Sequence, residues 1–306
     1  MTVKPLFGGV ELGGTKCICL IASAPDDIRA QLAIPTGSDP KATLERLIEQ
    51  LQAWRAVHGP IETLGVGSFG PIDRSAQSPT YGHITSTPKP GWRFVDVAGT
   101  LSRAMHVPVR FDTDVNGAAL AEGRWGAARD LEDFAYVTVG TGVGVGLVVN
   151  GALAHGFAHP ELGHMRIARQ PGDHANGACA LHADCVEGFA SGTAIAARTG
   201  TPAPQVAADD PVWQGVAHAL GQLLHTIVLA TAPRRIILSG GVAQARPELL
   251  PEVRRLLLHS LNGYVALETL AGPIDEYVVA AGLGAQAGPL GALALAVEAY
   301  RTGQTS

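Results

Sequence analysis

The sequence is poor in charge, in cysteine and in long apolar runs, and each shortage excludes a class of protein. Charged residues make up only 16% of the 306 residues, and no basic run is longer than a pair, which argues against a nucleic-acid partner. Four cysteines are too few to indicate a disulfide framework. No uncharged apolar run reaches the roughly 20 residues of a membrane helix, and the N-terminus lacks the apolar core of a signal peptide. We therefore expect a cytoplasmic protein with no membrane partner.

Glycine is the residue that the chain has in abundance, and it recurs in turns that follow apolar strands. There are 38 glycines in a sequence that is 46% hydrophobic, which is typical of a compact fold with many tight turns. Residues 6–22 predict a strand, a glycine turn and a second strand, and residues 136–155 repeat that pattern. A third turn follows the strand expected from residue 235. Self-similar units about 130 residues apart predict a duplicated α/β domain.

The remaining segments alternate between expected strands and helices. A helix is expected to begin at about Gly117, and a long apolar helix spans residues 212–231. We therefore predict an α/β protein of two lobes with an intervening cleft. The small lobe covers residues 1–115 and is joined by a C-terminal helix at 288–303, and the large lobe covers residues 116–287.

The glycine turns offer backbone N–H groups with no side chain in front of them, which is how proteins commonly cradle phosphates. The Rossmann spacing is absent because the second turn has strictly alternating glycines, and strand residues follow Lys16 where a Walker A loop opens a helix. Each turn alone is also explained by simple turn chemistry, but three together favour nucleotide phosphate. The residues expected to bind it are Gly13, Gly14, Thr15, Lys16, Gly140, Thr141, Gly142, Gly240 and Gly241.

Residues of metal-binding type gather between positions 164 and 185. Cys179, His182 and Cys185 stand three apart, and His164 precedes them by a loop rich in proline and glycine. Two thiolates and two imidazoles suit one tetrahedral Zn²⁺. Four protein ligands would fill its coordination shell, so this zinc would be structural. The alternative is two unrelated buried thiols beside surface histidines.

An acidic residue after a short strand is the candidate for proton transfer. Asp114 follows the strand that starts at residue 107 and precedes a helix N-terminus, whose positive end would keep a carboxylate ionised. An ionised carboxylate can accept the proton of an attacking alcohol in phosphoryl transfer. The same spacing fits a helix N-cap at either Asp112 or Asp114. Spacing alone leaves both roles open.

Taken together and in order, these motifs resemble those of the ROK family of sugar kinases, and most closely its bacterial fructokinases. The resemblance covers about residues 8–294 and rests on the segments Glu11–Lys16, Asp112–Asn116, Gly140–Gly146, His159–His164, Cys179–Glu187 and Ser239–Val242. It implies a duplicated actin-like ATPase fold of the ribonuclease H-like type, ATP with Mg²⁺, and a homodimer. It also implies that Asp114 is the general base and that the sugar pocket is lined by Glu161, His164 and Glu187, with His164 shared with zinc.

Three positions depart from the pattern of many relatives: Glu11 replaces Asp, Thr113 replaces Asn, and His182 replaces one thiolate. We interpret the last of these as the fructokinase-type variant of the zinc site. Loops 67–73 and 83–92 also resemble fructokinase pocket loops, although plain turn chemistry with a packed Trp would explain them too.

The activity that the resemblance implies is ATP-dependent phosphorylation of a hexose, with D-fructose converted to fructose 6-phosphate. Mannokinase, glucokinase and N-acetylmannosamine kinase activities are the alternatives, together with a non-catalytic sugar-sensing regulator. Regulators of the family carry a helix-turn-helix before the first phosphate motif, and a motif that starts at Glu11 leaves no room for one. We therefore expect ATP and a small sugar as partners, and no nucleic acid.

Overall fold

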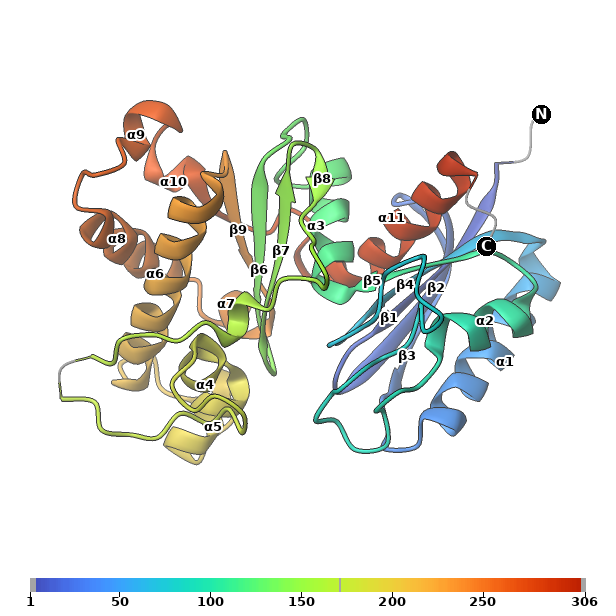
Figure 1. The fold of residues 1–306 in the computed structure, drawn as a ribbon, viewed down its shortest axis with the longest axis horizontal. Helices are drawn as coiled ribbons and strands as arrows, with labels where there is room; N and C mark the ends of the chain where they lie inside the picture. Colours follow the sequence, from blue (N-terminus) through green and yellow to red (C-terminus); the bar gives the residue numbers. More distant parts are fainter. Residues whose placement is uncertain (1–3, 171, 304–306) are drawn as a thin grey trace. The chain divides into compact units, whose positions relative to one another are not determined.

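The computed structural model describes residues 4–170 and 172–303, which form two compact units (Figure 1). The first unit contains the chain up to Trp125, residues 155–159 and the chain from Gln286 onward. The second contains Gly126–Ala154 and Pro160–Ala285. Each unit is built on a 5-stranded sheet and has its own hydrophobic core. The fold is therefore α/β and duplicated, as the repeated glycine turns predict.

The sheet of the first unit has the strand order β3-β2-β1-β4-β5. Its strands are β1 (Leu6–Leu12), β2 (Lys16–Ala24), β3 (Asp27–Pro35), β4 (Ile61–Ser68) and β5 (Val109–Thr113). β1, β2 and β3 form an antiparallel meander, whereas β4 and β5 extend the sheet from β1 in parallel. The carboxyl ends of β1, β4 and β5 consequently lie at one edge, where Glu11 is in register with Gly67 and Gly67 with Asp112.

Helices cover both faces of this first sheet. They are α1 (Pro40–His58), α2 (Val97–Met105), α3 (Asp114–Trp125) and α11 (Ala287–Thr302). α1 begins where the Asp39 carboxylate accepts a hydrogen bond from the N–H of Ala42, and it buries Leu47 in the core. On the other face α11 approaches β4 so closely that a Cβ at Gly65 would lie 2.0 Å from the carbonyl oxygen of Ala292.

The sheet of the second unit repeats this topology in the order β10-β9-β6-β7-β8. Its strands are β6 (Phe134–Val139), β7 (Val143–Val149), β8 (Ala152–Leu153), β9 (Arg235–Ser239) and β10 (Val278–Ala280). β6, β7 and β8 form the meander, and β9 and β10 are parallel to β6. Asn150 and Gly151 have φ values of 52° and 71°, so β7 and β8 are joined by the two-residue turn that this pair favours.

Helices of very different length complete the second unit. They are α4 (Val186–Ala190), α5 (Gly192–Thr199), α6 (Val212–Thr231), α7 (Gly241–Ala245), α8 (Leu249–Leu261), α9 (Leu267–Leu270) and α10 (Ile274–Tyr277), with the 3₁₀ turns η1 (Leu162–His164), η2 (Ala203–Gln205) and, at the junction with the first unit, η3 (Gly284–Gln286). α6 has the bounds expected from its apolar pattern and packs against α4 and α8. Its buried side chains form the centre of the second core.

Three details differ from the sequence expectations. No element is expected at residues 27–35, yet the alternation of apolar and polar side chains there is that of the half-buried edge strand β3. Helix α3 begins at Asp114 instead of Gly117, because Thr113 Oγ1 accepts a hydrogen bond from the N–H of Asn116. α3 also belongs to the first unit, beyond the expected boundary at residue 115, because it packs along α11.

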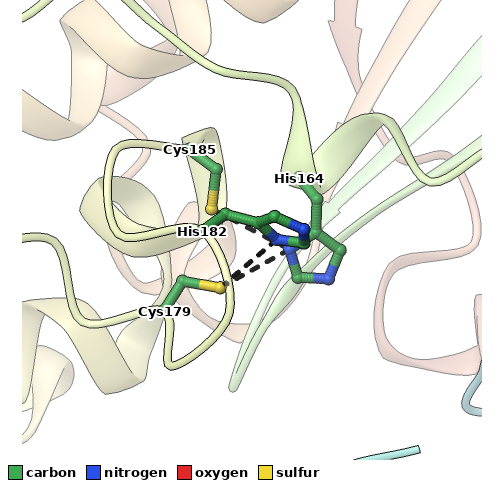
Figure 2. A group of neighbouring side chains, drawn as sticks. All are labelled: His164, Cys179, His182 and Cys185. Carbon is green, nitrogen blue, oxygen red and sulfur yellow. Dashed lines mark hydrogen bonds between the residues drawn. The ribbon is translucent and has the colours of Figure 1, made fainter. Parts of the chain in front are cut away.

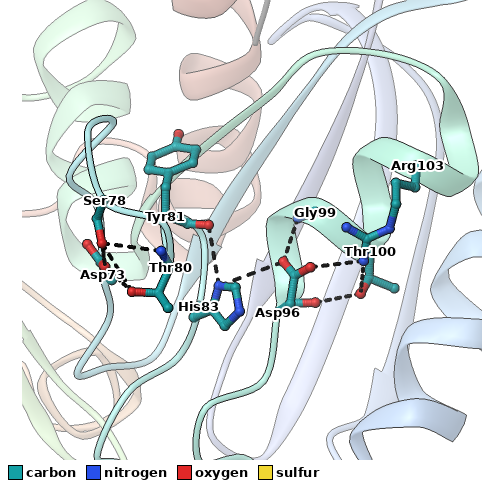
Figure 3. A network of polar contacts seen from close by, with 9 residues as sticks. All are labelled: Asp73, Ser78, Thr80, Tyr81, His83, Asp96, Gly99, Thr100 and Arg103. Carbon is teal, nitrogen blue, oxygen red and sulfur yellow. Dashed lines mark hydrogen bonds and ion pairs between the residues drawn. The ribbon is translucent and has the colours of Figure 1, made fainter.

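The loop between β4 and α2 is stabilised by polar side chains of its own (Figure 3). The Asp73 carboxylate accepts hydrogen bonds from the hydroxyls of Ser78 (2.5 Å) and Thr80 (2.6 Å). Asp96 caps α2 by accepting a bond from the N–H of Gly99 (2.8 Å). These bonds give a long loop a defined shape without a strand or helix.

Trp92, in the same loop, is fully buried in the first core. Its Nε1 donates a hydrogen bond to the carbonyl of Gly37 (2.8 Å), and its ring makes an edge contact with Phe69 at 5.5 Å. The indole is therefore a packing residue, which favours the simpler of the two explanations for this loop. No helix among residues 4–170 and 172–303 combines the length and apolar character that a bilayer crossing requires.

Candidate functional site

Asp114 lies at the junction of β5 and α3 and is partly buried. Its Oδ1 accepts a hydrogen bond from the N–H of Val115 (2.9 Å). Burial raises the pKa of this carboxyl to about 6, although the backbone bonds act in the opposite direction. The hydroxyl of Thr113 accepts a hydrogen bond from the N–H of Asn116 (3.1 Å). Thr113 therefore caps helix α3, and neither Asp112 nor Asp114 has the N-cap role that the sequence allowed.

Glu11, near the end of β1, is a second acid that interacts electrostatically with Asp114. Burial raises the pKa of Glu11 to about 7, the charge of Asp114 contributes in the same direction, and Lys16 opposes both. Its Oε2 is buried without a hydrogen-bond partner in the described part of the chain. Gly288 leaves room for this carboxylate, because a Cβ there would lie 2.1 Å from Glu11 Oε1. A buried carboxylate oxygen that lacks a donor fits a hard divalent cation such as Mg²⁺.

The first glycine turn, Gly13–Thr15, is held by backbone and side-chain groups from distant loops. Thr36 donates its N–H to the last carbonyl of the turn (2.9 Å) and its hydroxyl to the carbonyl of Gly13 (2.8 Å). Lys89 Nζ donates to the carbonyls of Gly14 (2.7 Å) and Thr36 (3.3 Å). A Cβ at Gly14 would meet nothing within 4 Å. The turn is therefore fixed in shape and open at Gly14, which suits a phosphate oxygen.

The second glycine turn, Gly140–Gly142, is supported by the following helices. Gly192 donates its N–H to the first carbonyl of the turn (2.7 Å), and the Thr193 hydroxyl donates to the second (2.8 Å). Glu187 Oε2 accepts a hydrogen bond from the N–H of Val143 (3.1 Å), and a Cβ at Gly142 would lie 2.5 Å from that oxygen. Glu187 thus lies directly against the turn.

The third turn follows β9 and requires glycine at its first position. Gly240 has a φ of 92°, and a Cβ there would lie 2.4 Å from the carbonyl oxygen of Val139. α7 begins at Gly241, where a Cβ would meet nothing. All three expected glycine turns are therefore formed, and Lys16 is exposed at the start of β2.

The four residues of metal-binding type converge (Figure 2). One ligand atom from each of His164, Cys179, His182 and Cys185 lies within 4.8 Å of the others. Cys179 Sγ is 3.7 Å from Nδ1 of His164 and 3.8 Å from Nδ1 of His182, and Cys185 Sγ is 3.8 Å from Nδ1 of His164. A tetrahedral Zn²⁺ with its usual bond lengths separates sulfur from nitrogen by about 3.6 Å. The donor set and its spacing therefore fit one Zn²⁺.

Packing and hydrogen bonds hold the loop that carries the cysteines. A Cβ at Gly188 would lie 2.2 Å from the carbonyl oxygen of Ala183, so the loop packs tightly on α4. Arg169 pairs with Asp184 through two hydrogen bonds (3.1 and 2.6 Å). Cys185 caps α4, because its Sγ accepts a bond from the N–H of Gly188 (3.4 Å). These contacts give the loop a defined shape.

The residues that the family resemblance assigns to the sugar belong to the second unit. Glu161 is exposed and precedes η1, where its carbonyl accepts a bond from the N–H of His164 (3.0 Å). His164 is one of the four residues that could hold a metal, and Glu187 lies in α4. Asp114 and the first glycine turn belong to the first unit.

Sequence reasoning does not single out three side chains that support these residues. Lys89 lies in a segment whose sequence resembles a pocket loop, so its role could have been suspected from the sequence. No sequence pattern points to Thr36 or Arg74. Arg74 forms a buried ion pair with Asp112 (2.8 Å), two residues before the candidate base.

The repeated sheet with a glycine turn between its first two strands is the actin-like, ribonuclease H-like architecture. Among solved structures of this class, a ROK hexokinase from Thermus thermophilus matches with a TM-score of 0.76 and 29% identity, covering 97% of this chain and 99% of that one. The ROK family profile matches residues 7–299, and the chain belongs to this family.

Two curated relatives are similar over nearly their whole length. A putative fructokinase of Bacillus subtilis (strain 168) is 39% identical over 296 residues, covering 97% of each chain. A fructokinase of Pediococcus pentosaceus is 39% identical over 296 residues, covering 97% of this chain and 99% of its own. The family resemblance read from the motifs is thereby confirmed.

Proposed function

We propose that the chain is an ATP-dependent sugar kinase that converts D-fructose to fructose 6-phosphate. The observation that carries this proposal is the 39% identity to a fructokinase and to a putative fructokinase over 97% of the chain. The desolvated carboxylate of Asp114, which is free of a capping function, adds the chemical group that the reaction needs. Other hexose kinases of the family are the alternatives.

In the proposed reaction, Asp114 accepts the proton of the sugar hydroxyl as this hydroxyl attacks the γ-phosphate of ATP. A base with a pKa near 6 is ionised at neutral pH and is a better proton acceptor than an ordinary aspartate. The N–H groups of the three glycine turns would hold the phosphates, with Lys16 beside the first turn. When Mg²⁺ is bound it neutralises charge on the phosphates, and Glu11 is the residue that would hold it.

Zinc, in this proposal, organises the sugar side of the second unit and takes no part in the chemistry. His164, Cys179, His182 and Cys185 would fill its coordination shell. His164 would fix the turn that begins at Glu161, so the metal would orient the proposed sugar ligands Glu161 and Glu187 indirectly. Homodimeric assembly and a cytoplasmic location remain predictions, which sedimentation and cell fractionation would test.

A coupled assay of ATP consumption over a panel of hexoses tests the proposal. We expect the highest kcat/KM with D-fructose, a lower value with mannose and a still lower one with glucose. Sites built to bind particular sugar hydroxyls discriminate in this way, because a missing or inverted hydroxyl leaves protein groups unpaired. If glucose or N-acetylmannosamine gives a higher kcat/KM than fructose, the proposed substrate is wrong but the proposed kinase activity stands. If no hexose supports ATP consumption, both the substrate and the kinase activity are wrong.

A further inference from the structure

The buried ion pair between Arg74 and Asp112 has no part in the proposed chemistry, yet it lies beside the candidate base. The Asp112 side chain is 1% exposed and that of Arg74 15%. Arg74 donates from Nε and Nη2 to the same oxygen, Oδ2, at 3.0 and 2.8 Å. The desolvation of a buried carboxylate and of a largely buried guanidinium offsets much of their attraction, so such a pair contributes little net stability. Stability alone is therefore a poor explanation for it.

The other carboxylate oxygen of Asp112 is bound to the turn that carries Asp114. Asp112 Oδ1 accepts hydrogen bonds from the N–H of Thr113 (2.8 Å) and from Nδ2 of Asn116 (2.7 Å). Thr113 Oγ1 in turn accepts a bond from the N–H of Asn116 (3.1 Å). Asp114 thus lies between two residues whose positions both depend on the orientation of the Asp112 carboxylate.

Arg74 is itself held in place by its loop. Two residues before it, the N–H of Ile72 donates to Nε2 of His159 (3.1 Å). Seven residues after it, the Tyr81 hydroxyl accepts a bond from the N–H of Phe111 in β5 (3.1 Å). The loop is therefore fixed on both sides of Arg74 and presents a guanidinium of defined position to Asp112.

Little freedom remains around Asp114 itself. A Cβ at Gly67 would lie only 3.2 Å from Asp114 Cα, so β4 confines the turn from one side. Glu11 from β1 interacts electrostatically with Asp114, and Lys16 acts on Glu11 in turn. The ends of β4 and the first turn of α11 carry no titratable side chain. The orientation of this base is therefore set by packing and by the Asp112 bonds.

We infer that Arg74 is a positioning residue, which fixes through Asp112 the β5–α3 turn that presents Asp114 to the sugar hydroxyl. This inference rests on the proposed function, in which Arg74 touches neither sugar nor nucleotide. Without the guanidinium, Asp112 is a buried carboxylate that lacks its cation and must turn toward water or another donor. A turn displaced in this way moves the base and lowers turnover, while substrate binding elsewhere is unaffected.

A double-mutant cycle on the full chain tests this inference through kcat and both KM values. In Arg74→Met we expect kcat to fall about tenfold or more, with KM for sugar and ATP within about twofold. Asp112→Asn keeps an oxygen for Thr113 and Asn116 but removes the buried charge. In the Asp112→Asn background, Arg74→Met should therefore change kcat by less than about twofold. Arg103→Met, which breaks an exposed pair with Asp96, is the matched control and should leave kcat unchanged.

Hydrogen–deuterium exchange of the backbone amides around residues 110–118 measures how well ordered the same turn is, independently of enzyme activity. We expect faster exchange in Arg74→Met than in wild type, and slower exchange again once Asp112→Asn is added. Equal kcat losses in both backgrounds, an unchanged kcat in Arg74→Met, or exchange that does not respond would each overturn the inference.

The variant Asp114→Asn separates this inference from the proposed function. If Asp114→Asn keeps wild-type turnover, the proposed base is wrong, and the exchange data alone then decide whether Arg74 orders the turn. If Asp114→Asn is inactive and the cycle shows no coupling, only the inference about Arg74 fails.

Discussion

The two sheets have the same strand order and pairing, but the residues at their carboxyl edges differ. In the first unit, Glu11 lies near the end of β1 and Asp114 follows β5. In the second, the corresponding strands β6 and β10 end at Val139 and Ala280. Both copies have a glycine turn between their first two strands, so the kind of turn that we propose to hold phosphate is common to them. Acidic side chains at these positions are found in the first copy only.

The two glycine turns also differ in what supports them. Each turn accepts one backbone N–H bond, from Thr36 or from Gly192, and one hydroxyl bond, from Thr36 or from Thr193. The first turn accepts a further bond from the charged side chain of Lys89. A turn that depends on side chains can be loosened by one substitution. A hydrogen bond from the backbone resists substitution, because every residue type except proline retains its N–H.

The largest effect is expected from removing the acid that distinguishes the first unit. Asp114→Asn keeps the shape and the bond from Val115 but cannot accept a proton, so kcat should fall about 10²-fold or more while sugar binding persists. Turnover and equilibrium sugar binding are the measurements. Asp112→Asn is the control and should reduce kcat far less. Comparable activity in Asp114→Asn and wild type would contradict the assignment.

Loss of metal should act on the second unit and leave the first intact. We expect about one Zn²⁺ per chain by metal analysis, and its loss in Cys185→Ser together with a lower Tm. Chelation should raise KM for sugar more than KM for ATP, because His164 is shared with the proposed sugar site. His174→Ala, in the same loop but outside the cluster, is the control and should retain the metal. A metal-free wild type with normal melting would refute the zinc proposal.

The pH profile of kcat should reveal the desolvated acid. Because burial raises the pKa of Asp114 to about 6, the active ionised form is present above that pH and is lost as pH falls through it. Turnover at pH 5 should therefore be about tenfold below its value at pH 7. The pH profile of Glu11→Gln tells which acid causes the fall in kcat at low pH. The fall should persist in this variant if it is caused by Asp114. A limb near pH 4 would mean that Asp114 titrates as an ordinary aspartate.

The smallest effects should come from the supports of the two turns. Lys89→Met keeps the aliphatic stem near Phe69 but removes two charge-assisted hydrogen bonds, so KM for ATP should rise about fivefold. Thr193→Val removes one hydroxyl bond from the second turn and should raise the same KM less than twofold, since the N–H of Gly192 remains. Steady-state kinetics with ATP varied would compare them. Equal effects would mean that the turns are supported alike.

Features with a local cause could be predicted from the sequence. The Asn150–Gly151 turn, the bounds of α6 and the convergence of the cysteines with His182 all follow from residues close in the chain. The motif order identified the family and the duplicated fold, which the ROK profile match confirms. These successes reflect short-range geometry, in which turn chemistry and helical periodicity leave few alternatives.

Features that depend on contacts between distant segments could not be predicted. Nothing near Asp112 in the sequence indicates that Arg74 neutralises it, and nothing near Glu11 indicates that Gly288 makes room for it. The cap at Thr113 could not be predicted because Asp112 and Asp114, on either side of it, belong to a residue type that caps helices equally well. The roles of the predicted ATP and sugar residues stay predictions, since the fold positions them without testing what they bind.

Helix α4 has a consequence for how this family can diverge. Cys185 caps this helix and is one of the four residues that could hold a metal. Two residues later, Glu187 accepts a hydrogen bond from the N–H of Val143, directly after the second glycine turn. The first carbonyl of that turn accepts a bond from the N–H of Gly192 in α5. The cysteine loop and the second glycine turn are therefore joined through one short helix, so a change in one is felt by the other. In chimeras between relatives, a crossover between Cys185 and Glu187 should therefore join a cysteine loop and a glycine turn that evolved to fit other partners.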